Sequence, residues 1–372
     1  MNARTPLLAF LSLVLVALVL LGCNGFFTPS SPGPTGVVTK FAFVANNNGG
    51  GPGSISAYTV NKNTGALTAV AGSPFASGTA TNTVGADGNG TFVFASNSVG
   101  AANLQGFAIN RTTGVLSAAA GSPLTVGTGP ALVAVDPSLR FVYLADTSGN
   151  NIFSFTVNST TGALTATTPP SIAAGGSPTA VYVDPSGRFV YVSLFPGLVS
   201  VFSINSSTGV LTAVSGSSLT GCTSIFSIVV DPTVRFAYAA DGLNSVCQFT
   251  VNGATGVLTA MTPASVVAGN TTVAVTTDPT AHFVYAVGEA SNNVSAYTIG
   301  SGGALAAVTG SPFATGVHPT AVSSEPSGLF LYVTNSSDNT VSIFTITTAT
   351  GALGTPTTAP TGPNPLSIVT TK

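Results

Sequence analysis

A single unit of about 50 residues recurs seven times in this 372-residue chain, and this repeat constrains its fold more than any other feature. Seven phenylalanines mark equivalent points, at spacings of 51, 49, 48, 47, 47 and 47 residues: Phe41, Phe92, Phe141, Phe189, Phe236, Phe283 and Phe330. A period of this length is typical of architectures in which neighbouring units bury a common core.

Each unit carries signals for four short strands. An alternating apolar strand opens with the phenylalanine, as in 141–144, and a second one follows a polar loop, as in 151–157. The turn before the third strand contains a glycine in every copy, a residue that tolerates positive φ: Gly65, Gly114, Gly162, Gly209, Gly256, Gly303 and Gly351. The fourth strand ends in an Asp-Pro turn, as in 136–140. Since no helical period occurs, the sequence predicts an all-β fold, a seven-bladed β-propeller of four-stranded antiparallel blades.

The two ends of the repeat region predict how the ring closes. The chain enters the first unit at Phe41 without an innermost strand, and it ends with another apolar strand at 366–370. We expect this C-terminal strand to join the N-terminal blade, because that pairing leaves no open sheet edge at the joint.

The residues before the repeats indicate an exported, lipid-anchored protein. One basic residue, Arg4, precedes an apolar run at 7–21 that is too short for a comfortable membrane span. The run ends in 20–23, Leu-Leu-Gly-Cys, which resembles the lipobox of bacterial lipoproteins, so Cys23 is the expected lipidation site. We therefore predict a signal peptide at 1–22, a lipidated cysteine with a flexible stalk at 23–39, and the propeller at 40–372. The expected location is the cell envelope, on the periplasmic or extracellular side of a membrane.

Two further cysteines, Cys222 and Cys247, lie within the repeats. An oxidising compartment permits a disulfide between them, and two small buried thiols are the alternative. Neither has a His or a third Cys nearby in sequence, which disfavours a metal site at this pair.

Charge is scarce, since Asp, Glu, Lys and Arg make up 5% of the chain and the formal net charge is −2. Proteins that bind nucleic acid through phosphate neutralisation carry clusters of Lys and Arg. The composition therefore excludes that class of partner. We expect a monomer.

The seventh unit carries the clearest family signature. It reads Tyr332-Val333-Thr334-Asn335, and 351–353, Gly-Ala-Leu, opens its outer strand. This resembles the YVTN-repeat propellers and the related lactonase family, which includes bacterial 6-phosphogluconolactonase, and the resemblance covers residues 40–372. It implies the propeller scaffold and, as a possible activity, opening of a lactone ring. The shared motifs lie in strands and turns, so no catalytic residue of the family is carried over.

Sorting the loops by face separates the charges. The loops that join the innermost strand to the second strand, and the third strand to the fourth, form what we call the lower face. The other two classes of loop, which join the second strand to the third and the fourth strand to the next blade, form the upper face. Every Lys and Arg of the mature chain falls on the lower face: Lys40, Lys62, Arg111, Arg140, Arg188, Arg235 and Lys372. Acids recur there in a turn role at Asp87, Asp136, Asp184, Asp231, Asp278 and Glu325, and His282 stands where other units have Arg.

The upper face holds acids and amides without cations. Its candidate binding residues are Asp146, Asp241, Glu289, Asp338, Asn151, Asn293 and Asn339, and its histidine is His318. A phosphorylated or multiply anionic substrate needs cationic partners, which these loops lack. We therefore expect a non-catalytic binding or scaffold module for a neutral saccharide or for a protein or peptide partner.

Two other interpretations of the upper face stay open. A lactonase acting on a neutral lactone would use His318 as general base with an upper carboxylate orienting it, whereas a structural His318 would hold only a loop end. The scattered carboxylates and amide oxygens suit Ca²⁺, but they come from different blades, so we predict no metal and no cofactor.

The lipid anchor is directly testable. Metabolic labelling with a radioactive or alkyne-bearing fatty acid should mark the wild-type protein, because the Cys23 thiol carries the acyl glycerol. The Cys23→Ser variant should remain unlabelled, and equal labelling of both proteins would refute the lipobox interpretation.

Overall fold

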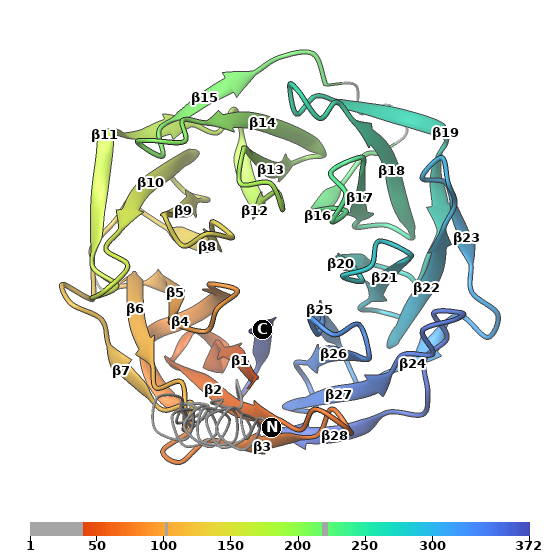
Figure 1. Ribbon diagram of the computed structural model, residues 1–372, viewed down its shortest axis with the longest axis horizontal. Helices are drawn as coiled ribbons and strands as arrows, with labels where there is room; N and C mark the ends of the chain where they lie inside the picture. Colours follow the sequence, from red (N-terminus) through yellow and green to blue (C-terminus); the bar gives the residue numbers. More distant parts are fainter. Residues whose placement is uncertain (1–39, 101–102, 218–221) are drawn as a thin grey trace, which may run out of the picture. The chain divides into compact units, whose positions relative to one another are not determined.

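The computed structural model describes residues 40–100, 103–217 and 222–372. Residues 1–39, including Cys23 and the predicted signal peptide, lie outside this range. The described residues contain one 3₁₀ turn, η1 (Asn48–Gly50), and otherwise strands and loops, with no helix long and apolar enough to cross a bilayer. The strands form seven blades around a central axis, which confirms the predicted all-β propeller (Figure 1).

Each blade has four strands, numbered outward from the axis. The innermost strands are β29 (Pro365–Thr370), β4 (Phe75–Ala86), β8 (Pro130–Val135), β12 (Ser177–Val183), β16 (Ile225–Val230), β20 (Thr272–Thr277) and β25 (Pro319–Ser324). The second strands are β1 (Phe41–Asn46), β5 (Phe92–Val99), β9 (Phe141–Asp146), β13 (Phe189–Phe195), β17 (Phe236–Asp241), β21 (Phe283–Gly288) and β26 (Phe330–Asn335).

The outer half of each blade is less regular. The third strands are β2 (Pro52–Val60), β6 (Leu104–Ile109), β10 (Asn151–Val157), β14 (Leu198–Ile204), β18 (Ser245–Val251), β22 (Asn293–Ile299) and β27 (Thr340–Thr345). The outermost strands are β3 (Leu67–Ala69), β7 (Leu116–Ala118), β11 (Leu164–Ala173), β15 (Leu211–Val214), β19 (Leu258–Val267), β23 (Leu305–Ala307) and β28 (Thr357–Pro360), and β24 (Phe313–Ala314) adds a short pairing to β22. Since β4 pairs with both β2 and β5, the first two blades form one continuous sheet.

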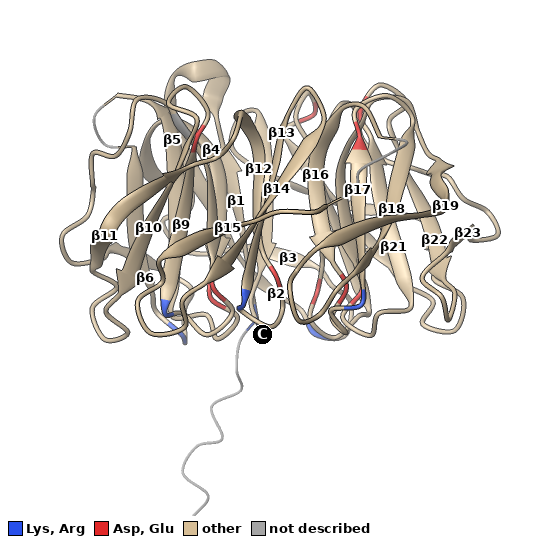
Figure 2. Cartoon of the chain, turned by 90° about the horizontal axis from the view of Figure 1, so that it is seen from above, with Lys and Arg blue, Asp and Glu red and all other residues tan. Residues whose placement is uncertain are grey.

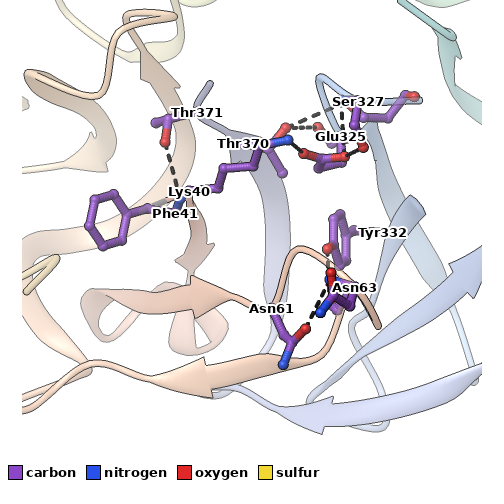
Figure 3. A network of polar contacts seen from close by, with 12 residues as sticks. Lys40, Phe41, Asn61, Asn63, Glu325, Ser327, Tyr332, Thr370 and Thr371 are labelled. Atoms are coloured by element: carbon purple, nitrogen blue, oxygen red, sulfur yellow. Dashed lines mark hydrogen bonds and ion pairs between the residues drawn. The ribbon is translucent and has the colours of Figure 1, made fainter. Parts of the chain in front are cut away.

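The ring closes between the last strand and the first, as the sequence predicts. β29 pairs antiparallel with β1, so the C-terminal strand becomes the innermost strand of the first blade. The amide of Phe41 donates to the hydroxyl of Thr371 over 3.1 Å. Beside it, Lys40 forms an ion pair with Glu325 of the seventh blade (Figure 3). Backbone pairing and an ion pair therefore hold the two ends of the repeat region together.

Neighbouring blades fit together through one repeated contact. The phenylalanine that opens the second strand of each blade packs against the turn glycine of the next blade. A Cβ added to the glycine would lie 2.3 to 2.6 Å from the ring in every case. The pairs are Phe41 with Gly114, Phe92 with Gly162, Phe141 with Gly209, Phe189 with Gly256, Phe236 with Gly303, Phe283 with Gly351, and Phe330 with Gly65 across the closure. All seven phenylalanines are at most 7% exposed, so this contact is part of the core between blades.

Five blades reinforce the contact with a tyrosine two residues after the phenylalanine. Its hydroxyl donates to the carbonyl of the same glycine, over 2.7 Å from Tyr238 to Gly303 and 2.9 Å from Tyr332 to Gly65. Burial raises the pKa of these hydroxyls, so they remain protonated donors at all physiological pH values. Phe43 and Phe94 take the tyrosine position in the first two blades, which lack this hydrogen bond.

The charged residues of the lower face make contacts that stabilise the fold. The turn acids are at most 2% exposed, and Asp231 accepts from the amides of Arg235 and Phe236 over 2.8 and 2.7 Å. The guanidinium of Arg235 stacks 4.7 Å from the Phe236 ring and donates to the carbonyl of Ser301 in the next blade. Arg140 and Arg188 repeat this arrangement. The sequence predicts the turn role of the acids, and the structure adds the contacts between blades.

The glycine contact can be tested within a single turn. Gly303→Ala should lower the free energy of unfolding by about 2–4 kcal/mol, because φ is +87° there and the new methyl group would overlap Phe236. The adjacent Gly302 has open space around its Cβ position, so Gly302→Ala is the matched control and should change stability by less than about 1 kcal/mol. Urea unfolding followed by circular dichroism measures both. Equal effects of the two variants would contradict the packing role of Gly303.

Candidate functional site

The two faces differ in charge as the loop assignment predicts. Figure 2 shows Lys and Arg gathered along one rim of the propeller, with Asp and Glu on both rims. In the part of the chain that the structure describes, the upper loops carry carboxylates and amides and no Lys or Arg. An anionic ligand on this face would meet no compensating cation.

The upper ends of the innermost strands share a β-bulge. In each blade one residue is left out of the pairing with the second strand, which re-aims the side chain at that point. We call these seven residues the axial ring: Asn82, Ala131, Thr179, Phe226, Val273, Thr320 and Leu366. None is charged. Neighbouring blades are linked here, since the Thr320 hydroxyl donates to the Pro365 carbonyl over 2.8 Å and the Thr179 hydroxyl to the Ile225 carbonyl over 3.0 Å.

His318 lies directly before the innermost strand of the seventh blade, with φ at 54°. Its amide donates to the side-chain oxygen of Asn292 over 2.8 Å, and its carbonyl accepts from the amide of Ser336 over 2.9 Å. The carboxylate of Asp338 accepts from the amide of Val317 over 2.7 Å. Contacts with Asn292, Ser336 and Asp338 therefore fix the backbone at His318 and Val317. The His318 ring is exposed and makes no hydrogen bond to the described residues.

The structure brings His318 and Asp338 to one corner, but their side chains do not form an ion pair within the described residues. Asp338 holds the loop rather than the imidazole. The predicted orientation of the His318 ring by an upper carboxylate is therefore absent from this conformation.

Asn364 is a residue of this corner that the sequence interpretation missed. It precedes Pro365 of β29 just as His318 precedes Pro319 of β25, and its φ is also positive, at 52°. Its amide donates to the Asn339 side chain over 2.7 Å, repeating the contact of His318 with Asn292. The Asn364 side chain makes no hydrogen bond to the described residues. Aligning the Asn-Pro and His-Pro pairs of the repeats would have revealed it.

The carboxylate of Asp146 is hydrogen-bonded within its own blade. The carboxylate is 1% exposed and accepts from the amides of Thr128, Gly129 and Gly149 over 2.8, 2.9 and 2.9 Å. Burial favours the neutral acid, but the donated hydrogen bonds outweigh burial and lower the pKa of Asp146 below its ordinary value. These contacts fasten the loop that leads into β8, which accounts for an acid at this position without any ligand.

Asp241 occupies the same strand position in the fifth blade, in a different environment. It is 4% exposed and accepts from the Ser245 hydroxyl over 3.2 Å, while its other oxygen has no hydrogen-bond partner among the described residues. A disulfide between Cys222 and Cys247, with Cα atoms 6.2 Å apart, fastens the segment before β16 to β18. The sequence left open whether these cysteines are bridged, and the structure has them joined.

The remaining candidate residues are dispersed. Glu289 is half-buried in the β21–β22 turn and its carboxylate makes no hydrogen bond to the described residues. Asn293 accepts from Ser291 over 3.3 Å, Asn151 donates to the Gly149 carbonyl over 2.9 Å, and Asn339 belongs to the His318 corner. In the described ranges no three His, Cys, Asp or Glu side chains converge to hold a metal ion, because the acids come from separate blades.

Comparisons with known proteins found a matching family model and several similar structures. Residues 111–226 match the family model described as "Lactonase, 7-bladed beta-propeller". A candidate 6-phosphogluconolactonase from Bacteroides fragilis has 19% sequence identity and a TM-score of 0.72, over 91% of this chain and 99% of the other. The periplasmic gluconolactonase of Pseudomonas aeruginosa has 15% identity and a TM-score of 0.68, over 90% and 99%. A protein from Lactobacillus plantarum has 18% identity and a TM-score of 0.75, over 90% and 99%. No curated protein matches the chain.

These findings confirm the resemblance to lactonase-family propellers. The family model covers less than half of the chain, and at these identities the structural matches establish the fold. They favour the hydrolase interpretation over the non-catalytic one, which no comparison supports.

The role of Asp146 gives a pH-dependent prediction. Because its pKa is lower in the folded state than in the unfolded chain, its stabilising effect is complete above the unfolded value of about 3.9 and is lost as the pH falls through the folded value. Asp146→Asn should cost about 1–3 kcal/mol of unfolding free energy at pH 7, and the cost should shrink at pH 3. Urea unfolding of both proteins at the two pH values measures this, with Glu289→Gln as control, because the Glu289 carboxylate makes no hydrogen bond to the described residues. A cost that does not change with pH would contradict the assignment.

Proposed function

We propose that this protein hydrolyses an uncharged sugar lactone, with the His318 corner of the upper face as its reaction site. The observation that carries the proposal is the exposed imidazole of His318, held on a fixed backbone beside an uncharged axial ring in a lactonase-like propeller. Among the similar structures, the one described as a periplasmic gluconolactonase acts, by its name, on a lactone without phosphate. A neutral lactone fits the cation-free upper face better than a phosphorylated one.

The chemistry assigns separate tasks to His318 and Asn364. The His318 imidazole accepts a proton from water as the water oxygen attacks the lactone carbonyl carbon. The side-chain amide of Asn364, in the equivalent position of the adjacent blade, donates a hydrogen bond to the carbonyl oxygen as negative charge develops on it. The ring C–O bond then breaks, and the proton held by His318 passes to the leaving alkoxide. Water and lactone give one hydroxy acid.

The predicted export signal and the disulfide support an extracytoplasmic location for this reaction. Cys222 and Cys247 pair in the structure, and disulfides persist in oxidising compartments. We propose that the protein is tethered through Cys23 and acts on lactones outside the cytoplasm. The fatty-acid labelling of Cys23 tests the tether independently of catalysis.

A lactone assay tests the function. The domain spanning residues 40–372 should hydrolyse glucono-1,5-lactone faster than the buffer reaction, and its 6-phosphate more slowly, as followed by acid release in a pH-stat. His318→Ala should lower kcat/KM by about 10² or more, the usual contribution of a general base. Asn364→Ala should lower kcat more than it raises KM, since its hydrogen bond strengthens as charge develops.

The chain supplies a matched control in its other histidine. His282 lies on the lower face, where its ring contacts the Thr280 hydroxyl over 2.8 Å, and His282→Ala should leave turnover unchanged. Equal losses in the His318 and His282 variants would contradict the assigned site. Absence of turnover with every lactone tested would reject the hydrolase, and preference for the phosphorylated lactone would reject the neutral substrate class.

A further inference from the structure

Exposed apolar side chains are concentrated on the upper face of two adjacent blades. Across the described ranges eight large apolar residues are well exposed, and seven of them lie at upper loops or upper strand ends. Five of these seven belong to the fourth and fifth blades: Phe195, Leu198, Phe226, Leu243 and Val267, with exposed fractions of 63, 56, 39, 60 and 80%. We call these five the apolar strip.

Close contacts bring together the turns that carry the strip. The β13–β14 turn between Phe195 and Leu198 is so close to the next blade that a Cβ on Gly197 would lie 2.2 Å from the Thr223 carbonyl. The Phe226 ring lies over Gly242, at 2.2 Å from its Cβ position. Leu243 follows Gly242, and its carbonyl accepts from the amide of Thr271 in the loop after Val267. The strip thus runs from the fourth blade across the fifth to the edge of the sixth.

The strip has a rigid base. The Cys222–Cys247 disulfide fastens the segment that leads to Phe226, and the amide of Gly242 donates to the Ser224 carbonyl over 2.7 Å. A surface fixed in this way loses little conformational freedom when a partner binds.

An uncharged pocket of about 270 Å³ continues the strip between the fifth and sixth blades. Val267 forms part of both, and Asn270, Ser291, Asn293 and Tyr297 supply polar groups to the pocket. Glu289 lies in the turn that carries Ser291, and the amide of the next residue, Ala290, donates to the Asn270 carbonyl over 3.2 Å. The turn that carries Glu289 therefore adjoins the pocket, and the Glu289 carboxylate has no hydrogen-bond or ion-pair partner among the described residues.

We propose that the apolar strip and this pocket form a docking site for an extended segment of another protein that carries apolar side chains and a Lys or Arg. The apolar side chains would cover the strip, and the cation would pair with Glu289. Charge complementarity favours this occupant, because the upper loops within the described ranges hold four acids and no cation. The site is separate from the His318 corner, so it does not depend on lactone hydrolysis.

The charges and apolar groups argue against a second copy of this chain as the occupant. Two upper faces brought together would place carboxylates against carboxylates. The lower face offers one well-exposed large apolar side chain in the described ranges, Leu329. Three of its four arginines, Arg140, Arg188 and Arg235, are already bound to main-chain carbonyls of the next blade.

Two synthetic peptides test the proposal. The first is a fluorescein-labelled ten-residue peptide of Leu, Ser and Lys, and the second has Glu in place of every Lys. Fluorescence anisotropy with the full propeller, residues 40–372, should show saturable binding of the Lys peptide and binding of the Glu peptide weaker by about tenfold or more. Equal affinity for the two peptides, or no saturable binding of the Lys peptide, would overturn the proposal.

Variants locate the binding. The double variant Phe195→Ser and Leu243→Ser should raise the Kd of the Lys peptide by about tenfold or more, because interface anchors are lost from the strip. Glu289→Gln should weaken binding and reduce its dependence on salt. Leu329→Ser, a matched change on the opposite face, should leave the Kd unchanged. All these variants should unfold at the wild-type temperature, because the replaced apolar groups are exposed and the Glu289 carboxylate makes no hydrogen bond to the described residues.

Other occupants give distinct outcomes that would overturn the proposal. Sedimentation of a dimer that the double variant abolishes would assign the strip to self-association. Retention on phosphatidylcholine vesicles that the double variant abolishes, without binding of the Lys peptide, would assign it to a membrane surface. A Leu329→Ser variant as weak as the double variant would show that the peptide does not use the strip.

Discussion

The propeller depends on a contact between an aromatic ring and a residue that has no side chain. In all seven blades a buried phenylalanine fills the space above the turn glycine of the next blade, and the seventh contact, between Phe330 and Gly65, joins the end of the repeat region to its beginning. Any larger residue than glycine would overlap the ring and would be strained at positive φ. The same pair of residues therefore sets the shape of the turn and the spacing between blades, which explains why each blade needs its neighbours to be stable.

This architecture uses most of the charge of the protein for structure. On the lower face, buried acids bind turn amides, and four of the seven cations, Lys40, Arg140, Arg188 and Arg235, bind residues of a neighbouring blade. The upper face has its own structural acid in Asp146, whose lowered pKa reflects donated hydrogen bonds that outweigh burial. The groups left over for chemistry or binding on the upper face are few and mostly neutral. They separate into the His318 corner on the seventh blade and the apolar strip on the fourth and fifth.

The division between these two regions bears on function. A neutral lactone and a basic peptide segment are compatible with the same acidic face, since neither requires a cation from the protein. The His318 corner has a fixed backbone and an exposed ring, and the proposed general-base role rests on these two features. The apolar strip is fixed by the Cys222–Cys247 disulfide and by close packing of turns. The proposed hydrolysis and the proposed docking therefore involve different residues and can be tested separately.

The sequence by itself determined the number of blades, the four strands of each, the closure by the last strand and the separation of cations from the upper face, because all of these follow from short motifs repeated at a fixed period. It also predicted the turn role of the acids and gave His318 as a candidate residue. Only the tertiary structure decided which upper residues meet. It placed Asp338 on the loop beside His318, engaged Asp146 within its own blade, brought Asn364 next to the His318 corner and joined the apolar side chains of two blades into one strip. Such meetings depend on bulges and loop paths between blades, whose residues differ from copy to copy and leave no periodic signal in the chain.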